Sequence, residues 1–395
     1  MNLIIDSIMG SGKTTWAISR MNRNPRRKFI FVTPFLTEDK RIREGCPSLN
    51  FVEPDGTYSK LSDLKRLVAE GRNVATTHAL LGQWKPTAKD TDNLRRWNYT
   101  LILDEALEMI QPVQRLNSDD LDILRDEWIE IEAATGKVKW ITETCPQRYR
   151  DIEKLAEAGR LHICRGSQLL DLTPIDILKA MPNMIVLTFL FEASHMYYYM
   201  QIHGMKWKKA YIHDGRLQMG EADLTEKKQE IKSLLSIYDG KYNQCGEEKK
   251  ALSASFWSST QNIRERHQVV KNIRSFFLTR CRSHVNQCMW SIFKDKTGSE
   301  TNIVKGFKTA FVPFNCKATN DYGDRTCLAY AVNVYDNPMV LAWFYDHGQR
   351  PDGHLFALSA MLQWIWRSAI RNGQPVKLYL PSLRMRTILC RWLNS

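Results

Sequence analysis

The chain begins with a short apolar run that leads into a glycine-rich turn and then a polar helical stretch. These three segments read NLIID (2–6), SIMGSG (7–12) and KTTWAISRM (13–21). A strand, a glycine-rich turn and a helix N-terminus in this order form a phosphate-binding loop, because backbone N–H groups and the helix dipole attract negative charge. The sequence therefore predicts an α/β unit with a phosphate site at its N-terminus.

Individual residues of this turn have expected roles. Lys13 should reach the β- and γ-phosphates of a nucleotide, and the Thr14 hydroxyl should take a coordination position on Mg²⁺. Gly10 and Gly12 let the backbone approach the phosphates closely. Ser7 stands where the usual pattern has glycine, and we expect it to be tolerated because the turn needs a small residue there. The residues expected to hold the nucleotide are Met9, Gly10, Ser11, Gly12, Lys13, Thr14 and Thr15.

Apolar runs alternate with polar helical stretches over the first 110 residues, as in a parallel sheet with crossover helices. After the first run come KFIFVTP (28–34), NVATT (73–77), YTLILDEA (99–106) and NMIVLTFLF (183–191). Residues 115–180, before the last run, are expected to form a helical insert, with one helix from Ser118 to Gly136.

The length of 395 residues suits two domains, and a second alternating series follows the first. Its expected strands include NQCMWSIF, TAFVPF and LAYAVNVY, and LFALSAMLQWIWRSAIRNG is expected to be a helix. We place the boundary near residue 200, which gives an α/β lobe over 1–200 and a second over 201–395.

Lysine and arginine number 56 against 43 acidic residues, which gives a net charge of +13. This excess favours a polyanionic partner such as nucleic acid, although a basic soluble protein without such a partner would show it too. The nine cysteines include no C-x-x-C pair, which argues against a zinc module or a disulfide framework. No apolar run is long enough to span a bilayer, and no signal peptide is present, so we expect a cytoplasmic protein that is neither secreted nor bound to a membrane.

An acidic pair, Asp104 and Glu105, follows the apolar letters of LILDEA. The carboxyl end of a buried parallel strand is where ligands bind in open α/β sheets. Asp104 there can hold Mg²⁺ through its water shell, while Glu105 polarises an attacking water. Acidic pairs after strands are common, so the pair alone is weak evidence for a metal site. It indicates a nucleotide site only because a phosphate loop precedes it in the same α/β series.

A pattern of polar residues recurs every four positions near the C-terminus, at Gln363, Arg367 and Arg371. In a helix this spacing keeps them near one face. Two guanidinium groups presented together can neutralise the oxygens of a transferring phosphoryl group. The alternative is an amphipathic helix with a solvated basic face.

Together the phosphate loop, the acidic pair and the arginines resemble superfamily 2 helicases, the DEAD/DEAH-like ATPases, and the compact size resembles bacteriophage members. The resemblance implies two RecA-like lobes with ATP in the cleft between them, and Arg367 as an arginine finger. Two departures from the family's arginine motif, Trp366 in place of glycine and Ile370 in place of the second arginine, make Arg367 a better candidate than Arg371. The nucleic-acid contacts that it implies are Thr33, Pro34, Thr76, Thr77, His78 and Thr319.

These features predict an ATP- and Mg²⁺-dependent nucleic-acid helicase or translocase, with DNA favoured and RNA left open. We expect it to act in phage DNA replication or recombination, alongside proteins of those processes. A terminase-like packaging ATPase is an alternative, but it would need clustered acids, and the acids here are scattered at Asp321, Asp324 and Asp336. An ATP-gated nucleic-acid switch without unwinding also remains open, and a nucleotide kinase is less favoured.

Overall fold

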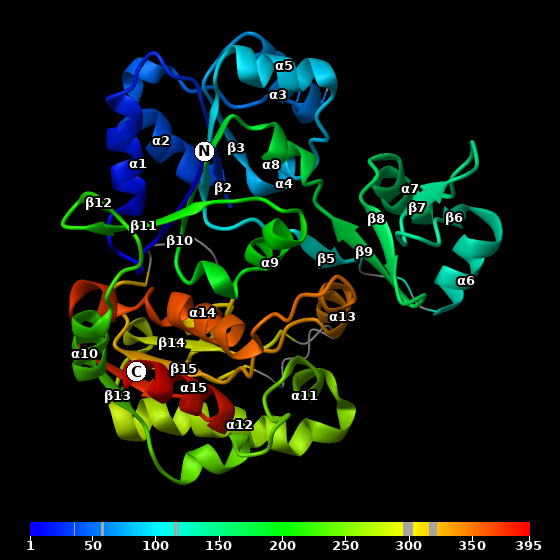
Figure 1. Cartoon of the computed structure of the whole chain (residues 1–395). Helices are drawn as coiled ribbons and strands as arrows, with labels where there is room; N and C mark the ends of the chain where they lie inside the picture. The colour runs from blue at the N-terminus through cyan, green and yellow to red at the C-terminus, as the bar shows by residue number, and fades with distance from the viewer. Residues whose placement is uncertain (35, 57–58, 114–115, 117, 295–302, 316–321) are drawn as a thin grey trace. The chain divides into compact units, whose positions relative to one another are not determined.

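Two α/β units make up the computed structural model, which describes residues 1–34, 36–56, 59–113, 116, 118–294, 303–315 and 322–395 (Figure 1). The first unit contains Met1–Ala222 and Asn337–Pro351, and the second contains Asp223–Asp336 and Asp352–Ser395. The boundary differs from the expected one near residue 200 because strands β11 and β12 extend the sheet of the first unit. A short segment of the C-terminal half also returns to the first unit.

A seven-stranded sheet organises the first unit in the order β12-β11-β1-β10-β4-β2-β3. All neighbouring strands are parallel except the pair β11 and β12. The strands are β1 (Asn2–Asp6), β2 (Phe29–Thr33), β3 (Val74–Thr77), β4 (Thr100–Asp104), β10 (Asn183–Thr188), β11 (Lys208–His213) and β12 (Arg216–Met219). Five of them coincide with the predicted apolar runs, which are continuous because both faces of the sheet are covered. The predicted α/β class is confirmed.

Successive residues of the strands belong to two different apolar clusters, one on each face of the sheet. In β1, Leu3 and Ile5 lie in one cluster and Ile4 lies in the other. This alternation follows from the period of two in a strand. The helices around the sheet are α1 (Lys13–Asn22), α2 (Leu36–Gly45), α3 (Lys60–Ala69), α4 (His78–Leu81), α5 (Ala88–Arg96), α8 (Asp176–Ala180) and α9 (His195–Ile202).

The insert between β4 and β10 is not the helical segment that we predicted from its sequence. It contains β5 (Ile110–Pro112), α6 (Ser118–Glu127), β6 (Ile129–Ile131), β7 (Val138–Trp140), α7 (Arg150–Glu157), β8 (Leu161–Cys164) and β9 (Gln168–Leu172). The predicted helix ends at Glu127 instead of Gly136, because the apolar residues after it alternate with a period of two. Gly136, with a φ of 68°, then turns the chain between β6 and β7.

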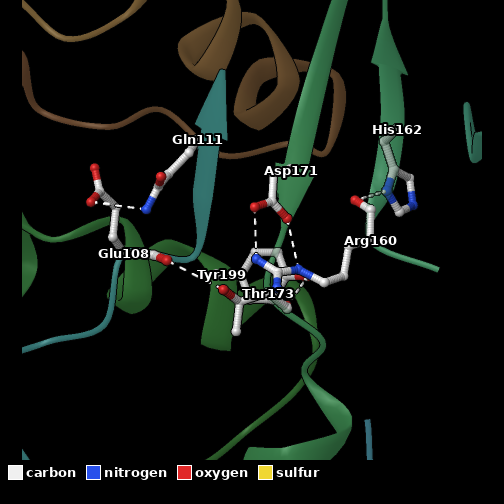
Figure 2. Close-up of polar contacts among 7 residues, drawn as sticks. All are labelled: Glu108, Gln111, Arg160, His162, Asp171, Thr173 and Tyr199. Carbon is white, nitrogen blue, oxygen red and sulfur yellow. Dashed lines mark hydrogen bonds and ion pairs between the residues drawn. The ribbon is translucent and has the colours of Figure 1, made fainter. Parts of the chain in front are cut away.

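Polar contacts connect the insert to α9 (Figure 2). Arg160 donates two hydrogen bonds to the Asp171 carboxylate, at 2.8 and 2.7 Å. Burial raises the pKa of Asp171, and the Arg160 guanidinium opposes this rise. The Thr173 hydroxyl donates to the Glu108 carbonyl at 3.3 Å, and the Tyr199 hydroxyl of α9 donates to the Thr173 carbonyl at 3.1 Å. The three-stranded sheet β5-β9-β8 is therefore joined to the rest of the first unit by side chains as well as by the backbone.

Helix α13 (Pro338–Asp346) is the segment of the C-terminal half that returns to the first unit. Its Trp343 ring stacks on Tyr199 with centroids 5.6 Å apart. Asp346 accepts two hydrogen bonds from Arg165, at 3.0 and 2.7 Å. The α13 residues that belong to the apolar core of the first unit are Val340, Ala342, Trp343 and Phe344. Helix α13 is thus part of the first unit's core, although sequence order places it within the second lobe.

A four-stranded parallel sheet with the order β13-β16-β15-β14 organises the second unit. Its strands are β13 (Leu235–Ile237), β14 (Cys288–Ser291), β15 (Cys327–Tyr330) and β16 (Val376–Tyr379). Its helices include α10 (Thr225–Leu234), α11 (Ala254–Ser258), α12 (Ile263–Ser275), α14 (Gly353–Ile365) and α15 (Leu383–Leu393). The expected strand TAFVPF forms only an isolated bridge between Phe311 and Trp290. Across the described residues of both units, no helix is both long and apolar enough to cross a membrane.

Candidate nucleotide site

The glycine-rich turn between β1 and α1 leaves the start of α1 without a side-chain cap. Gly12 is the N-cap residue and has a φ of 86°, in the left-handed region that favours glycine. A Cβ added at Gly12 would meet nothing within 4 Å, so the space beside the turn is open. The buried hydroxyl oxygen of Ser11 has no hydrogen-bond partner among the described residues. A helix start without a cap, open space and an unsatisfied hydroxyl together fit a phosphate group.

Lys13 bends back over this turn. Its Nζ donates to the carbonyl oxygens of Ser7 and Ile8, at 2.6 and 3.1 Å. Burial lowers the pKa of Lys13, and Glu105 opposes this most strongly, followed by Asp104 and Asp6. The ammonium group is thus desolvated beside the turn and close to carboxylates, where an incoming phosphate would interact with it strongly.

The Ser7 side chain has a structural role that glycine could not fill. Ser7 is buried, and its hydroxyl oxygen accepts a hydrogen bond of 2.7 Å from the backbone N–H of Ile212, which lies in β11. Its own N–H donates to the Thr188 carbonyl of β10 at 3.0 Å. Ser7 therefore forms hydrogen bonds from the start of the turn to β10 and β11, the two strands that neighbour β1. These bonds explain why serine is accommodated at this position.

Thr14 and Asp104 meet although they are far apart in the sequence. The Thr14 hydroxyl lies 3.5 Å from Oδ1 of Asp104. They come together because β10 pairs with both β1 and β4, so that the carboxyl ends of these parallel strands share one sheet edge. No group of three or more metal-ligating side chains occurs among the described residues. A hydroxyl and a carboxylate still fit Mg²⁺ bound to a nucleotide, which takes its other ligands from phosphates and water.

Glu105 turns the chain away from β4. It has a φ of 78°, which is uncommon for a residue other than glycine and costs of order 1–3 kcal/mol. Its backbone N–H donates to the Leu187 carbonyl of β10 at 2.9 Å, which holds the residue in this conformation. The Glu105 carboxylate opposes the lowering of the pKa of Lys13 more than any other charge does.

Asp6 is a member of this site that the sequence analysis did not identify. Its carboxylate oxygens accept hydrogen bonds from the backbone N–H groups of Leu190 and Phe191, at 2.8 and 2.9 Å. Burial raises the pKa of Asp6, while these two hydrogen bonds and the charge of Lys13 oppose the rise. The available signal was an acid as the last letter of the buried run NLIID, at the sheet edge where ligands bind.

The residues of the first unit that were predicted to contact nucleic acid differ from one another in burial and in hydrogen bonding. Thr33 and Thr76 are 0% and 1% exposed, because their strands lie inside the sheet, so their side chains are not accessible to a nucleic-acid strand. The Thr77 hydroxyl oxygen caps α4 by accepting from the N–H of Leu80 at 3.3 Å. His78 Nε2 donates to the Asp104 carbonyl at 3.0 Å, which makes His78 a neighbour of the nucleotide site.

Pro34 and Thr319 are the other two residues that were predicted to contact nucleic acid. Pro34 follows β2 and is half-buried. Thr319 lies outside the described residues, so the structure gives no account of its surroundings.

The second unit contains Gln363, Arg367 and Arg371, but they do not share one helix face as predicted. Helix α14 ends at Ile365, and Arg371 lies in a separate 3-10 turn, Ala369–Asn372, where it is exposed. The break comes at Ser368, whose hydroxyl oxygen accepts from the N–H of Ile370 and so begins the new turn. Gln363 is the only one of the three that lies within α14, and it donates to the Ser359 hydroxyl at 3.3 Å.

The chain is similar to a family model, to a curated protein and to solved structures. A family model described as the YonV C-terminal Rossmann-like domain matches residues 229–393. The SPbeta prophage-derived protein YonV of Bacillus subtilis (strain 168) is 34% identical over 412 residues, which cover 99% of this chain and 98% of that protein. A solved structure of XPD helicase aligns over 100% of this chain and 95% of its own, with a TM-score of 0.47 and 12% identity. Apo XPD aligns over 99% and 95%, with a TM-score of 0.47 and 11% identity.

Proposed function

The chain belongs to the family of the prophage-derived protein YonV, and we propose that it is an ATP-dependent nucleic-acid translocase or helicase. The observation that carries this proposal is the meeting of Thr14 with Asp104 beside Lys13 at one sheet edge. A phosphate loop and a strand-end carboxylate in contact are the two parts that a nucleotide-hydrolysing site requires. The prophage origin of the relative supports a role in phage DNA replication or recombination.

In the proposed site, residues 9–15 hold ATP. The N–H groups at the start of α1 bind the phosphates, and Lys13 exchanges the Ser7 and Ile8 carbonyls for phosphate oxygens. Thr14 and Asp104 would hold Mg²⁺ that arrives with the nucleotide, and the ion would neutralise charge on the phosphates. Glu105 accepts a proton from the attacking water, because it is a carboxylate next to the metal-binding residue at the same strand end.

The charge of the chain supports nucleic acid as the partner. With a net charge of +13, the protein gains binding free energy by releasing the counterions that surround a phosphate backbone. We propose that DNA is the preferred substrate. Strand binding would favour the state that hydrolyses ATP, and hydrolysis would return the protein to a state that binds the strand differently, so that each cycle moves the protein along the strand.

We expect nucleic acid to stimulate ATP hydrolysis several-fold. The measurement is phosphate release by the full-length protein with Mg²⁺ and ATP, alone and with single- or double-stranded DNA or RNA. The Lys13→Ala variant, prepared in the same way, gives the background rate because it lacks the cation that binds the phosphates. A hydrolysis rate that no DNA or RNA changes would remove the translocase proposal, whereas stimulation by one of them identifies the substrate.

A second expectation concerns the arginine that completes the site. Replacing Arg367 by Ala should lower turnover more than replacing Arg371 by Ala, with ATP affinity unchanged in both variants. Arg367 follows Trp366, the C-cap residue of α14, and is half-buried, whereas Arg371 is exposed in the separate turn. A finger acts on the charge of the transition state and therefore affects turnover more than binding. The comparison needs kcat and KM for both variants, and equal kcat values would exclude Arg367 as the finger.

A further inference from the structure

A groove of about 1160 Å³ lies in the second unit, between helix α12 and the chain that precedes it. Its walls come from the 3-10 turn Lys241–Gly246, from the segment that follows this turn, and from α11. It exceeds the usual volume of a small-ligand pocket, roughly 300–1,000 Å³, and therefore suits an extended ligand. None of the residues proposed for ATP binding or hydrolysis lines it.

One stripe of α12 forms the floor of the groove. Glu265, Gln268, Asn272 and Ser275 all line it, and their spacing of three and four positions places them on one helix face. Gln268 donates to Asn272 at 2.9 Å, and Asn272 donates to the Tyr242 carbonyl at 3.3 Å. The first bond orders the floor, and the second attaches it to the wall formed by the turn Lys241–Gly246.

Basic side chains dominate the charge of the groove. The cations that line it are Lys241, Lys250, Lys271 and Arg274, and the carboxylates are Glu248 and Glu265. The three lysines are exposed, and the described part of the chain provides no ion-pair partner for any of them. Lysines that form no ion pair with the described residues attract a polyanion, and the four cations along this groove outnumber its two carboxylates.

Two aromatic side chains, Tyr242 and Phe256, also line the groove, together with the amide groups of Gln244, Gln261 and Asn262. Aromatic rings stack on unpaired bases, and amides can bind base edges that a duplex keeps paired. We propose that this groove binds a single strand of nucleic acid, with the lysines on its phosphates and the aromatic rings beside its bases. The proposal rests on the proposed function only in taking nucleic acid as the partner, and it requires no ATP.

The test compares two variants of the full-length protein that each lose three positive charges. The groove variant carries Lys241→Gln, Lys250→Gln and Lys271→Gln. The control variant carries Lys232→Gln, Lys308→Gln and Lys377→Gln, which change exposed lysines of the second unit that do not line the groove. The probes are fluorescein-labelled oligothymidine and oligouridine of about 16 nucleotides and a duplex of the same length. Binding is measured by fluorescence anisotropy without nucleotide, over a range of salt concentrations.

We expect the groove variant to bind the single strands about fiftyfold more weakly than wild type at ~0.15 M salt, with a salt slope shallower by about 2. This follows because each lysine–phosphate contact to a single strand releases about 0.7 counterion. The control variant should lose much less. Equal losses in the two variants, preference for the duplex, or equally good competition by poly-glutamate would each overturn the proposal.

This result is separable from the test of the proposed function. If nucleic acid does not stimulate ATP hydrolysis but the groove variant alone loses binding, the translocase proposal fails and the groove assignment stands. If stimulation is observed but the groove variant binds single strands like wild type, the groove assignment alone is removed.

Discussion

Replacing Glu105 by Gln should slow ATP hydrolysis by about 10²–10⁴-fold and leave ATP binding nearly unchanged. The substitution keeps the size and shape of the side chain but removes the group that accepts the proton of the attacking water. The unusual backbone of Glu105, with its hydrogen bond to the Leu187 carbonyl, does not depend on the carboxylate. The loss should therefore appear in kcat and not in the affinity for ATP.

The matched control for this substitution is Glu108→Gln. Glu108 lies three residues further along the same segment, is exposed, and accepts a hydrogen bond from Gln111 at 3.1 Å. It is not among the groups that shift the pKa of Lys13. Single-turnover hydrolysis and equilibrium binding of a fluorescent ATP analogue measure the two quantities. A Glu105→Gln variant that hydrolyses ATP at the rate of the Glu108→Gln variant would show that Glu105 is not the general base.

Replacing Trp343 by Ala should destabilise the first unit by about 3–5 kcal/mol. The Trp343 side chain is 6% exposed within the core of this unit, stacks on Tyr199, and lies 3.8 Å from the His347 ring by centroid distance. Removing it leaves a cavity that rigid neighbours cannot fill. For a unit of this size the loss corresponds to a fall of roughly 6–20 °C in the melting temperature.

Tyr345→Ala on the same helix provides the comparison, because Tyr345 is 47% exposed and its loss leaves no cavity. Thermal melting followed by circular dichroism, with saturating ATP added in a parallel sample, reports on the first unit. ATP should raise the melting temperature of the unit that binds it. If the two variants melt at the same temperature, α13 does not contribute to the core in the way that the structure indicates.

The parts of the fold that the sequence predicted well are those in which a local pattern and the tertiary environment agree. The five central strands of the first sheet are continuous apolar runs, and they are buried on both faces. The insert was predicted wrongly because acidic, helix-favouring letters after Ser118 outweighed the alternation of Ile129 and Ile131. Only pairing with β7, across the turn at Gly136, makes that alternation decisive.

The residues of the candidate site also differ in how well the sequence predicted them, depending on whether a local pattern records their contacts. The residues of the phosphate loop and the strand-end pair are adjacent in sequence to the elements that position them, and their contact could be inferred from the sheet edge. Asp6 is positioned by N–H groups of Leu190 and Phe191, far along the chain, so its role depended on a contact that no local pattern records. The arginine segment could not be predicted because a serine cap divides it, and local spacing alone favoured a continuous helix.

The order of the chain gives α13 a further consequence during synthesis. The first unit needs residues 337–351 to complete its core, but the ribosome makes residues 223–336 of the second unit before them. At bacterial-type elongation rates this interval lasts roughly 6–23 s. During that time the core surface that Trp343 and Phe344 will cover stays open on the nascent chain. The first unit can thus complete its core only after residues 223–336 of the second unit have been made, while the second unit still awaits residues 352–395, so the two units do not fold strictly one after the other.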